Sequence, residues 1–450
     1  MLRKLHHWWQ ECRSSFWFVP AVVVLDSVVL AIVLITVDST IDLPVIERWP
    51  LLFGSGAAGA RGLLTAVAGS MITVAGVVFS ITLVALSLTS SQYTSRVIRT
   101  FMRDRVTQVV LGVFVGIFAY CLVVLRTIRG GDEGAFVPAL AVLAGLIVAF
   151  VGIASLIYFI HHISVLIQAS SIIAATAEET IAAVDRLFAQ ELDDDDRDGI
   201  LWPSFANQLW SAIPARKTGY IESFDTGALL DVARDSGTIL RMEHGIGDFI
   251  IEGAPLLSVM GPGSVDDETT AKLNAAYSVS RQRTVETDAA FGIRQIVDIA
   301  MKALSPGIND TTTAVMCIDY LAAIMVRLTT RKFAPSHCLD QGKLRLMTRG
   351  PSFESLLAEA FDQIRQNGAG NVAIMVRLLD ALHTIAGQTA DPGRRRAVGE
   401  RMQWVAELAE RTIGSPYDRA RFAGKLARVR EAFETRAIIS THEQPTRDGE

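Results

Sequence analysis

Four apolar runs, each long enough to cross the hydrocarbon core of a bilayer, restrict the fold of this chain more than any other feature. They occupy residues 16–37, 63–89, 106–125 and 137–160. A helix needs about 20 apolar residues to span about 30 Å of hydrocarbon. Backbone groups inside lipid must be hydrogen-bonded within the chain, so these runs predict four transmembrane helices.

Charged residues are rare in the first third of the chain and frequent after it. The chain is 50% hydrophobic and 20% charged, with a net charge of -5. Residues 1–162 hold 11 Lys and Arg and 8 Asp and Glu, which leaves 31 and 39 for residues 163–450. We therefore expect an α-helical membrane domain of four transmembrane helices, followed by an α+β cytoplasmic domain. The negative charge disfavours nucleic acid as a partner.

The second part of the chain divides further by its residue pattern. Residues 163–215 predict a membrane-proximal helix and an acidic linker, because the helical pattern of the fourth span continues as one long helix to about Gln190. Short β-type runs between glycines predict a small β-barrel-like module at 216–262. We expect a helical cytoplasmic domain at 263–440 and a disordered tail at 441–450.

The positions of Lys and Arg predict which side of the membrane each end faces. Arg3, Lys4 and Arg13 precede the first span, and four arginines lie at 96–105 after the second span. Cytoplasmic loops carry an excess of Lys and Arg. We therefore place both termini in the cytoplasm.

One face of the second span is built from small residues. A 3.5-residue repeat that starts at Gly62 passes through Gly69, Thr73, Gly76 and Ser80. Lipid supplies no hydrophobic force between helices, so such a seam marks the close approach of another backbone. We interpret Gly62, Gly69 and Gly76 as a helix-packing seam. The hydroxyls of Thr73 and Ser80 leave a pore lining as the alternative.

An acidic residue, Asp26, lies near the middle of the first span. A carboxylate at this depth costs roughly 2.5 to 3.5 kcal/mol. It serves either as a hydrogen-bonded group that faces a Thr or Ser of the second span or as part of a cation or proton site. Asp26, Thr73 and Ser80 therefore make a candidate intramembrane polar site.

Two adjacent histidines, His161 and His162, follow the fourth apolar run. Adjacent side chains on a helix point about 100° apart, which suits one shared metal ion poorly. We expect interfacial hydrogen bonds instead, and a pH-sensitive contact is the alternative.

A break in the helical pattern occurs at 305–310. Pro306 and Gly307 stop one helix, and Asn309 or Asp310 can cap the next. Alternatively, polar residues gather here into a site at a domain or subunit junction. The residues of that candidate cytoplasmic junction site are His161, His162, Asp288, Asn309 and Asp310, with Arg281 and Arg283 beside them.

The sequence lacks the motifs that usually mark an enzyme or a metal site. It has no phosphate-binding glycine loop, no H-E-x-x-H and no nucleophile elbow. The acidic run at 191–199 starts like a calcium loop, but Phe205 stands where the twelfth position needs Glu. We expect no catalytic residues, no metal and no cofactor, and hence no enzyme.

Several stretches resemble a family of bacterial membrane proteins. They are Phe-Trp-Phe-Val-Pro at 16–20, Gly-Ser-Met-Ile-Thr-Val-Ala-Gly-Val-Val-Phe-Ser at 69–80, Ser-Gln-Tyr-Thr-Ser-Arg at 91–96, Tyr-Phe-Ile-His-His-Ile at 158–163 and Ala-Leu-Ser-Pro-Gly-Ile-Asn-Asp at 303–310. To about residue 390, the chain resembles the family called domain of unknown function 2254. The resemblance implies a multi-pass protein of the bacterial inner (plasma) membrane and supplies no activity.

These observations leave two function classes. The seam and Asp26 favour an oligomeric, channel-like or transport-related protein with a large cytoplasmic regulatory domain. Its partners are the lipid bilayer, further copies of the chain, and a small ion or solute. The alternative is a membrane-anchored sensor or scaffold, which transmits ligand or partner binding through the fourth helix and transports nothing.

Overall fold

The computed structural model describes residues 17–40, 56–92, 104–130, 136–189, 208–261 and 265–442. The chain divides into two compact units, Met1–Ser171 and Ile172–Glu450, which we call the membrane unit and the C-terminal unit. Some sequence predictions concern segments outside the described residues: Arg3, Lys4 and Arg13, most of the arginine cluster at 96–105, the acidic run at 191–199 and nearly all of the tail at 441–450.

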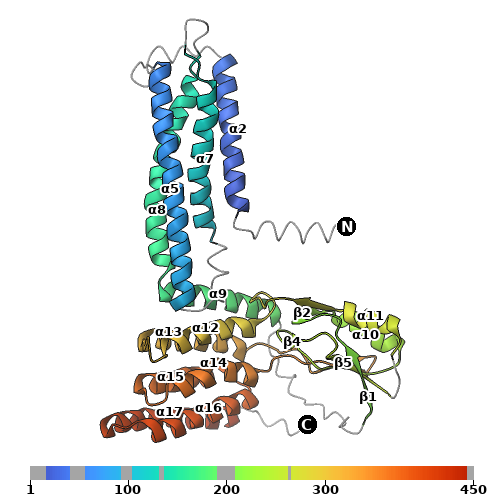
Figure 1. Cartoon of the computed structure of the whole chain (residues 1–450). Helices are drawn as coiled ribbons and strands as arrows, with labels where there is room; N and C mark the ends of the chain where they lie inside the picture. Colours follow the sequence, from blue (N-terminus) through green and yellow to red (C-terminus); the bar gives the residue numbers. More distant parts are fainter. Residues whose placement is uncertain are drawn as a thin grey trace. The chain divides into compact units, whose positions relative to one another are not determined.

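The membrane unit consists of long apolar helices at the positions of the four runs. They are α2 (Phe18–Thr40), α5 (Ala57–Gln92), α7 (Arg105–Thr127) and α8 (Ala139–Leu166). Each is long and apolar enough to cross a membrane. The helices run side by side, and α7 contacts α2, α5 and α8 (Figure 1).

Glycines of α7 and α8 allow the helices to pack closely. A Cβ atom added to Gly112 would lie 3.0 Å from the Cα atom of Pro20 in α2, and one added to Gly116 would lie 2.5 Å from Oγ of Ser27. On α8, a Cβ atom at Gly145 would lie 2.7 Å from Cδ2 of Leu64 in α5. Small residues at helix contacts are the usual route to dense packing in lipid.

Polar contacts join the helix ends on the side where α2 and α7 end. Both carboxylate oxygens of Asp38 in α2 accept hydrogen bonds from α8, from the N–H groups of Leu140 (3.2 Å) and Ala141 (3.1 Å). The first N–H groups of a helix have no partner within it, so Asp38 satisfies two of them. The guanidinium of Arg61 donates to the carbonyl of Ile128 at 2.7 Å.

The expected long helix from the fourth span to about Gln190 is wrong. α8 ends at Leu166, and a separate helix, α9 (Ala169–Leu187), begins three residues later. The N–H of Gln168 bonds to the carbonyl of Val165 at 3.1 Å, a tightened last turn that ends the helix. No Gly or Pro marks this break, which is why the residue pattern missed it.

The C-terminal unit contains both helices and strands, as the predicted α+β class requires. After α9 its helices are α10 (Thr226–Asp235), α11 (Asp267–Ala275), α12 (Ala289–Ala303), α13 (Thr311–Thr329), α14 (Phe353–Asn367), α15 (Val372–Gln388), α16 (Pro392–Thr412) and α17 (Pro416–His442). Its strands are β1 (Trp210–Pro214), β2 (Gly219–Phe224), β3 (Leu240–Met242), β4 (Phe249–Ile250), β5 (Pro255–Met260), β6 (Tyr277–Ser280), β7 (His337–Asp340) and β8 (Lys343–Met347).

The strands form two small sheets rather than one module at 216–262. One sheet has the order β1-β5-β3-β8-β7, and the other has the order β4-β2-β6. Three of these strands, β6, β7 and β8, come from the region predicted to be helical. β8 pairs parallel to β3, with Leu240 opposite Leu346. Such a pairing depends on residues far apart in the sequence, so local patterns do not reveal it.

The remaining helices pack in successive layers. α12 and α13 pack against α14 and α15, which in turn pack against α16 and α17 (Figure 1). Close contact extends to α9, because a Cβ atom added to Gly292 of α12 would collide with the side chain of Thr180. The apolar faces of these helices are buried against one another.

By length and composition, α13 is also apolar enough to cross a membrane, so the described residues contain five such helices and not the four predicted. α13 lies in the C-terminal unit and packs against α12, α14 and α15. It carries charged residues in ion pairs: Asp319 with Arg377, and Arg327 with Asp185.

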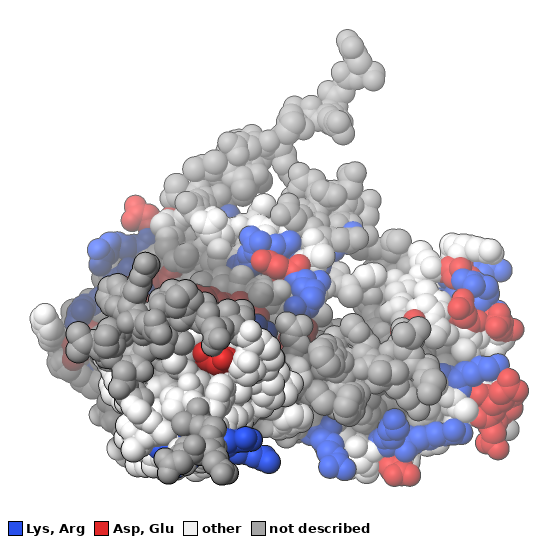
Figure 2. Space-filling model, turned by 90° about the horizontal axis from the view of Figure 1, so that it is seen from above, with Lys and Arg blue, Asp and Glu red and all other residues white. Residues whose placement is uncertain are grey.

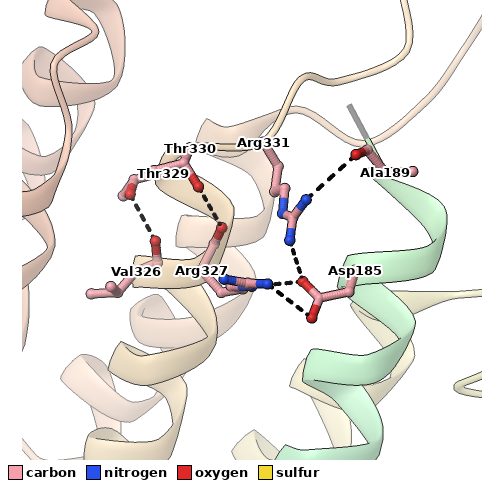
Figure 3. Close-up of polar contacts among 7 residues, drawn as sticks. All are labelled: Asp185, Ala189, Val326, Arg327, Thr329, Thr330 and Arg331. Atoms are coloured by element: carbon pink, nitrogen blue, oxygen red, sulfur yellow. Dashed lines mark hydrogen bonds and ion pairs between the residues drawn. The ribbon is translucent and has the colours of Figure 1, made fainter. Parts of the chain in front are cut away.

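Figure 3 shows the charged contact that joins α9 to the end of α13. Asp185 of α9 accepts from Arg327 (Nε to Oδ1, 2.6 Å) and from Arg331 (Nη2 to Oδ1, 2.6 Å). Hydrogen bonding to the Arg327 guanidinium holds the pKa of Asp185 below its usual value. One carboxylate thus bridges two cations near the last turn of α13.

A buried arginine completes the C-terminal end of α13. Arg394 of α16 donates to the carbonyls of Leu328 (3.0 Å), Thr329 (2.7 Å) and Arg331 (2.9 Å). Its guanidinium also lies over the ring of Phe333, with Cζ 5.1 Å from the ring centroid. These bonds satisfy carbonyls that a helix end leaves without partners.

On the face that Figure 2 shows, Lys and Arg lie in small groups close to Asp and Glu. Mixed charge of this kind is typical of a surface in contact with water.

Candidate functional site: an intramembrane carboxylate and a hydroxyl-bearing helix face

Asp26 lies on α2 with its side chain exposed. Among the residues that the structure describes, it has no hydrogen-bond or ion-pair partner. The neighbouring Ser27 faces α7 and donates to the carbonyl of Val23 at 2.8 Å. The α2 surface therefore packs through Ser27, while Asp26 points away from that contact.

Contacts between the helices establish the depth of Asp26. Ser27 of α2 meets Gly116 of α7, and the next residue of α7, Ile117, meets Gly152 of α8 together with Met71 of α5. Asp26 therefore lies at about the level of Met71. This level is close to the middle of the four helices.

The middle of the small-residue seam, between Gly69 and Thr73 of α5, lies at this depth. Gly62, Gly69 and Gly76 are exposed, and a Cβ atom added to any of them meets nothing within 4 Å. Thr73 and Ser80 are also exposed. Within one chain, a side chain at these three glycines would therefore meet no described residue, and the packing of the seam against another backbone stays a prediction.

α5 packs through its opposite face, which consists of Ala60, Leu64, Ala68, Met71, Ala75, Val78 and Ala85. This buried stripe has the same spacing as the seam, because both follow the helical repeat. The sequence pattern alone therefore did not show which of the two faces of α5 packs against the other helices.

The hydroxyls of the seam bond to their own helix. Thr73 donates to the carbonyl of Gly69 at 2.8 Å, and Ser80 donates to the carbonyl of Gly76 at 2.9 Å. Neither hydroxyl bonds to Asp26 of the same chain, which was one of the two alternatives for that carboxylate. Each hydroxyl oxygen retains acceptor capacity, so the seam can still bind a donor or a cation.

The two histidines near the C-terminal end of α8, His161 and His162, have different surroundings. His162 Nε2 lies 3.0 Å from Oδ2 of Asp104, and its ring stacks on Tyr158 at 6.1 Å between centroids. Asp104 also caps α7 by accepting from the N–H of Thr107 at 2.9 Å. His161 is exposed. The polar partner of His162 is thus the cap of a neighbouring helix.

The proposed gathering of Asp288, Asn309 and Asp310 does not occur. Asp288 caps the first turn of α12, and Asp310 caps α13, which begins after α12 has ended. The 15 residues of α12 separate the two caps by about 22 Å at 1.5 Å per residue. The simple capping interpretation of Asp310 is the one that the structure shows.

The two caps have different electrostatic surroundings. Burial raises the pKa of Asp288, although Arg283 donates to it at 2.8 Å. Hydrogen bonds from Thr313 lower the pKa of Asp310. Asn309 has a positive φ of 49°, which suits the tight connection between the helices. Both carboxylates therefore have structural partners.

Asp38 is a polar residue that the sequence reasoning did not single out. The only sequence signal for its helix-end contact was the position of an acidic residue near the end of an apolar run. In the part of the chain that the structure describes, no group of three or more His, Cys, Asp or Glu is arranged to hold a metal ion.

Comparison with known proteins places the chain in a family. The family of predicted membrane proteins DUF2254 matches residues 13–384. An uncharacterized protein of Mycobacterium bovis, Mb1321c, is 35% identical over 392 residues, which cover 85% of this chain and 74% of that protein. The uncharacterized protein Rv1290c of Mycobacterium tuberculosis has the same identity and coverage. No solved structure matches. The chain therefore belongs to the DUF2254 family of predicted membrane proteins.

Proposed function

We propose that this protein forms a homo-oligomer in the membrane and conducts a small ion or solute. The observation that carries the proposal is the exposed carboxylate of Asp26 at mid-depth of α2, which has no partner among the residues that the structure describes. In a single chain this group would face lipid, where it costs roughly 2.5 to 3.5 kcal/mol. Association that removes Asp26 from lipid lowers this cost.

The seam of α5 is the complementary surface. α2 and α5 pack on α7, and Asp26 lies at the depth of Met71, between Gly69 and Thr73 along α5. We propose that α2 of one copy lies against α5 of the next. The small residues admit the close approach, and repetition of this head-to-tail contact generates a ring. Asp26 and the hydroxyls of Thr73 and Ser80 then line its polar path.

The proposed topology has four spans, with both termini in the cytoplasm of a bacterium and the protein in its inner membrane. α13 is assigned to the C-terminal core, because its ion pairs with Arg377 and Asp185 belong to that unit. Alkaline phosphatase fused after Asp42 should be active, and the same enzyme fused after Gly199 should be inactive. The opposite pattern would refute the orientation.

The proposal assigns transport and no catalytic step, because no recognised catalytic motif occurs in the sequence. The decisive test is flux or single-channel recording of the purified chain in planar bilayers across pH 5 to 8. Asp26→Asn keeps the volume and removes the charge, so we expect a changed conductance or pH dependence with the oligomer retained. Asp26→Glu should preserve the parent behaviour.

Two outcomes count against the proposal. Identical currents in the parent and in Asp26→Asn would show that the carboxylate does not act in the path. No current in the parent, at any voltage, tension or pH, would contradict conduction itself.

A specific observation favours the sensor as a second candidate. A cavity of about 280 Å³ in the C-terminal unit is lined by Arg216, Lys217, Asn274 and Tyr277, among others. Asn274 holds two backbone groups beside this cavity. Its Oδ1 accepts from the N–H of Arg216 at 2.9 Å, and its Nδ2 donates to the carbonyl of Pro214 at 3.1 Å. A protein that binds an anion in this cavity but passes no current would be a sensor.

A further inference from the structure

A second cavity lies in the membrane unit, where α2 and α7 end. Its volume is about 410 Å³, and it is lined by Ile35, Ser39, Arg126, Thr127, Arg129 and Phe136. Small-molecule sites in proteins commonly have volumes of about 300 to 1,000 Å³. This cavity is therefore large enough to hold a small polar headgroup.

Its charge comes from two arginines. Arg126 lies in the last turn of α7, and Arg129 follows it in a short bridge with Phe136. Within the described residues, neither guanidinium has an ion-pair partner, and both side chains are exposed. The neighbouring Asp38 directs both carboxylate oxygens to the N–H groups of α8. The described lining of the cavity thus carries two positive charges and no negative one.

The hydroxyls beside the arginines are oriented by their own helices. Ser39 donates to the carbonyl of Thr36, and Thr127 donates to the carbonyl of Val124, both at 2.8 Å. The N–H groups of arginine are the donors that match phosphate oxygens best. The polar side of this cavity therefore suits a phosphate group.

The surface one turn further into the membrane unit is apolar. Leu122 lies one turn before Arg126 on α7 and is 48% exposed, and Ile32 lies one turn before Ile35 on α2 and is 53% exposed. Residues three or four apart occupy the same helix face. A molecule that places a phosphate between the arginines would extend an apolar part along these side chains.

We infer that this cavity binds the phosphate of a phospholipid headgroup, with the acyl chains along the exposed faces of α2 and α7. The position of the cavity at the ends of two membrane helices agrees with this ligand, because headgroups lie at that level. The inference is independent of conduction, and a protein that passes no current can still hold the lipid.

Native mass spectrometry of the full chain in detergent tests the inference. The probe is phosphatidylglycerol, added at increasing concentration to delipidated protein, and a parallel series receives inorganic phosphate. We expect the parent to retain bound lipid, and Arg126→Gln with Arg129→Gln to weaken lipid binding by about tenfold or more. Inorganic phosphate should not displace the lipid at millimolar concentration.

Arg105→Gln is the matched control, because Arg105 is an exposed arginine at the opposite end of α7. It should bind phosphatidylglycerol like the parent. If the double variant does not fold, Arg129→Gln alone should still weaken lipid binding severalfold. Equal retention by the parent and either cavity variant would overturn the inference. Displacement of the lipid by inorganic phosphate would instead assign the cavity to free phosphate and overturn the lipid assignment.

Discussion

The Nε2 atom of His162 on α8 lies 3.0 Å from Oδ2 of Asp104, the residue that caps α7. The two residues are 58 positions apart in the sequence. The carboxylate of Asp104 therefore caps α7 and also contacts α8 through His162. Asp104 is 13% exposed, so water competes little for this contact. The pair therefore holds together the ends of two membrane helices.

Replacement of Asp104 by Ala should destabilise the membrane unit. The variant loses the cap of α7 and leaves His162 without its partner, which together costs about 1 to 3 kcal/mol. Thermal unfolding in detergent should show a lower midpoint for Asp104→Ala. Asp104→Asn keeps an acceptor for the cap and should lose less. Equal midpoints for the parent and Asp104→Ala would contradict this role.

Bulk at Gly116 and at Gly76 should have different effects, because the two glycines have different surroundings. A Cβ atom at Gly116 collides with Ser27, whereas one at Gly76 meets nothing within 4 Å. Gly116→Leu should therefore reduce the yield of folded protein by separating α2 from α7, at a cost of about 1 to 3 kcal/mol or more.

Gly76→Leu tests the seam as an interface. We expect this variant to fold like the parent and to lose the native oligomer, measured by light scattering in detergent with the detergent mass subtracted. Val77→Leu is the control, since Val77 is also exposed but lies off the seam. An intact oligomer in Gly76→Leu would show that the seam faces lipid.

Arg394 should tolerate no replacement, including Lys. Its two terminal nitrogens reach three carbonyls at the end of α13, and the single amine of Lys cannot match that geometry. Because the site is buried, Arg394→Lys should cost about 2 to 4 kcal/mol, measured as a shift in denaturant midpoint. Arg396→Lys, at an exposed position of the same helix, should be nearly neutral. Similar shifts for both would refute the assignment.

The contact of Asp185 predicts a pH-dependent stability. The pKa of Asp185 is lowered in the folded chain, chiefly by the hydrogen bond from Arg327. Its folded pKa lies below the unfolded value of about 3.9, so its stabilisation is present above that pH and is lost as pH falls through the folded pKa. Because Asp185 is 38% exposed, we expect its charge to contribute only about 1 kcal/mol to the free energy of unfolding.

Asp185→Asn provides the comparison. The parent should exceed the variant in unfolding free energy at pH 6 to 7, and the two should converge as the pH drops below about 4. Denaturant titrations at several pH values measure this difference. A constant difference down to pH 2 would show that the charge of Asp185 contributes nothing.

Sequence alone accounted for the features that depend on nearest neighbours and on solvent. The apolar runs identified α2, α5, α7 and α8, because only a helix of that length satisfies its backbone in lipid. The cap at Asp310 was likewise readable, since a short polar side chain before a helix bonds to the N–H groups that follow it. Asp26 was recognised because its chemistry conflicts with its surroundings.

Only the tertiary structure decided which surfaces meet. It showed that α5 packs through Met71 and Ala75 rather than through Gly69 and Gly76, and that β8 joins the sheet of β3. The buried face and the glycine seam of α5 have the same helical period, so the sequence does not tell them apart. The pairing of β3 with β8 links residues about a hundred positions apart. Local sequence carries no information about which partner a face or an edge will meet, because that choice depends on the packing of the whole chain.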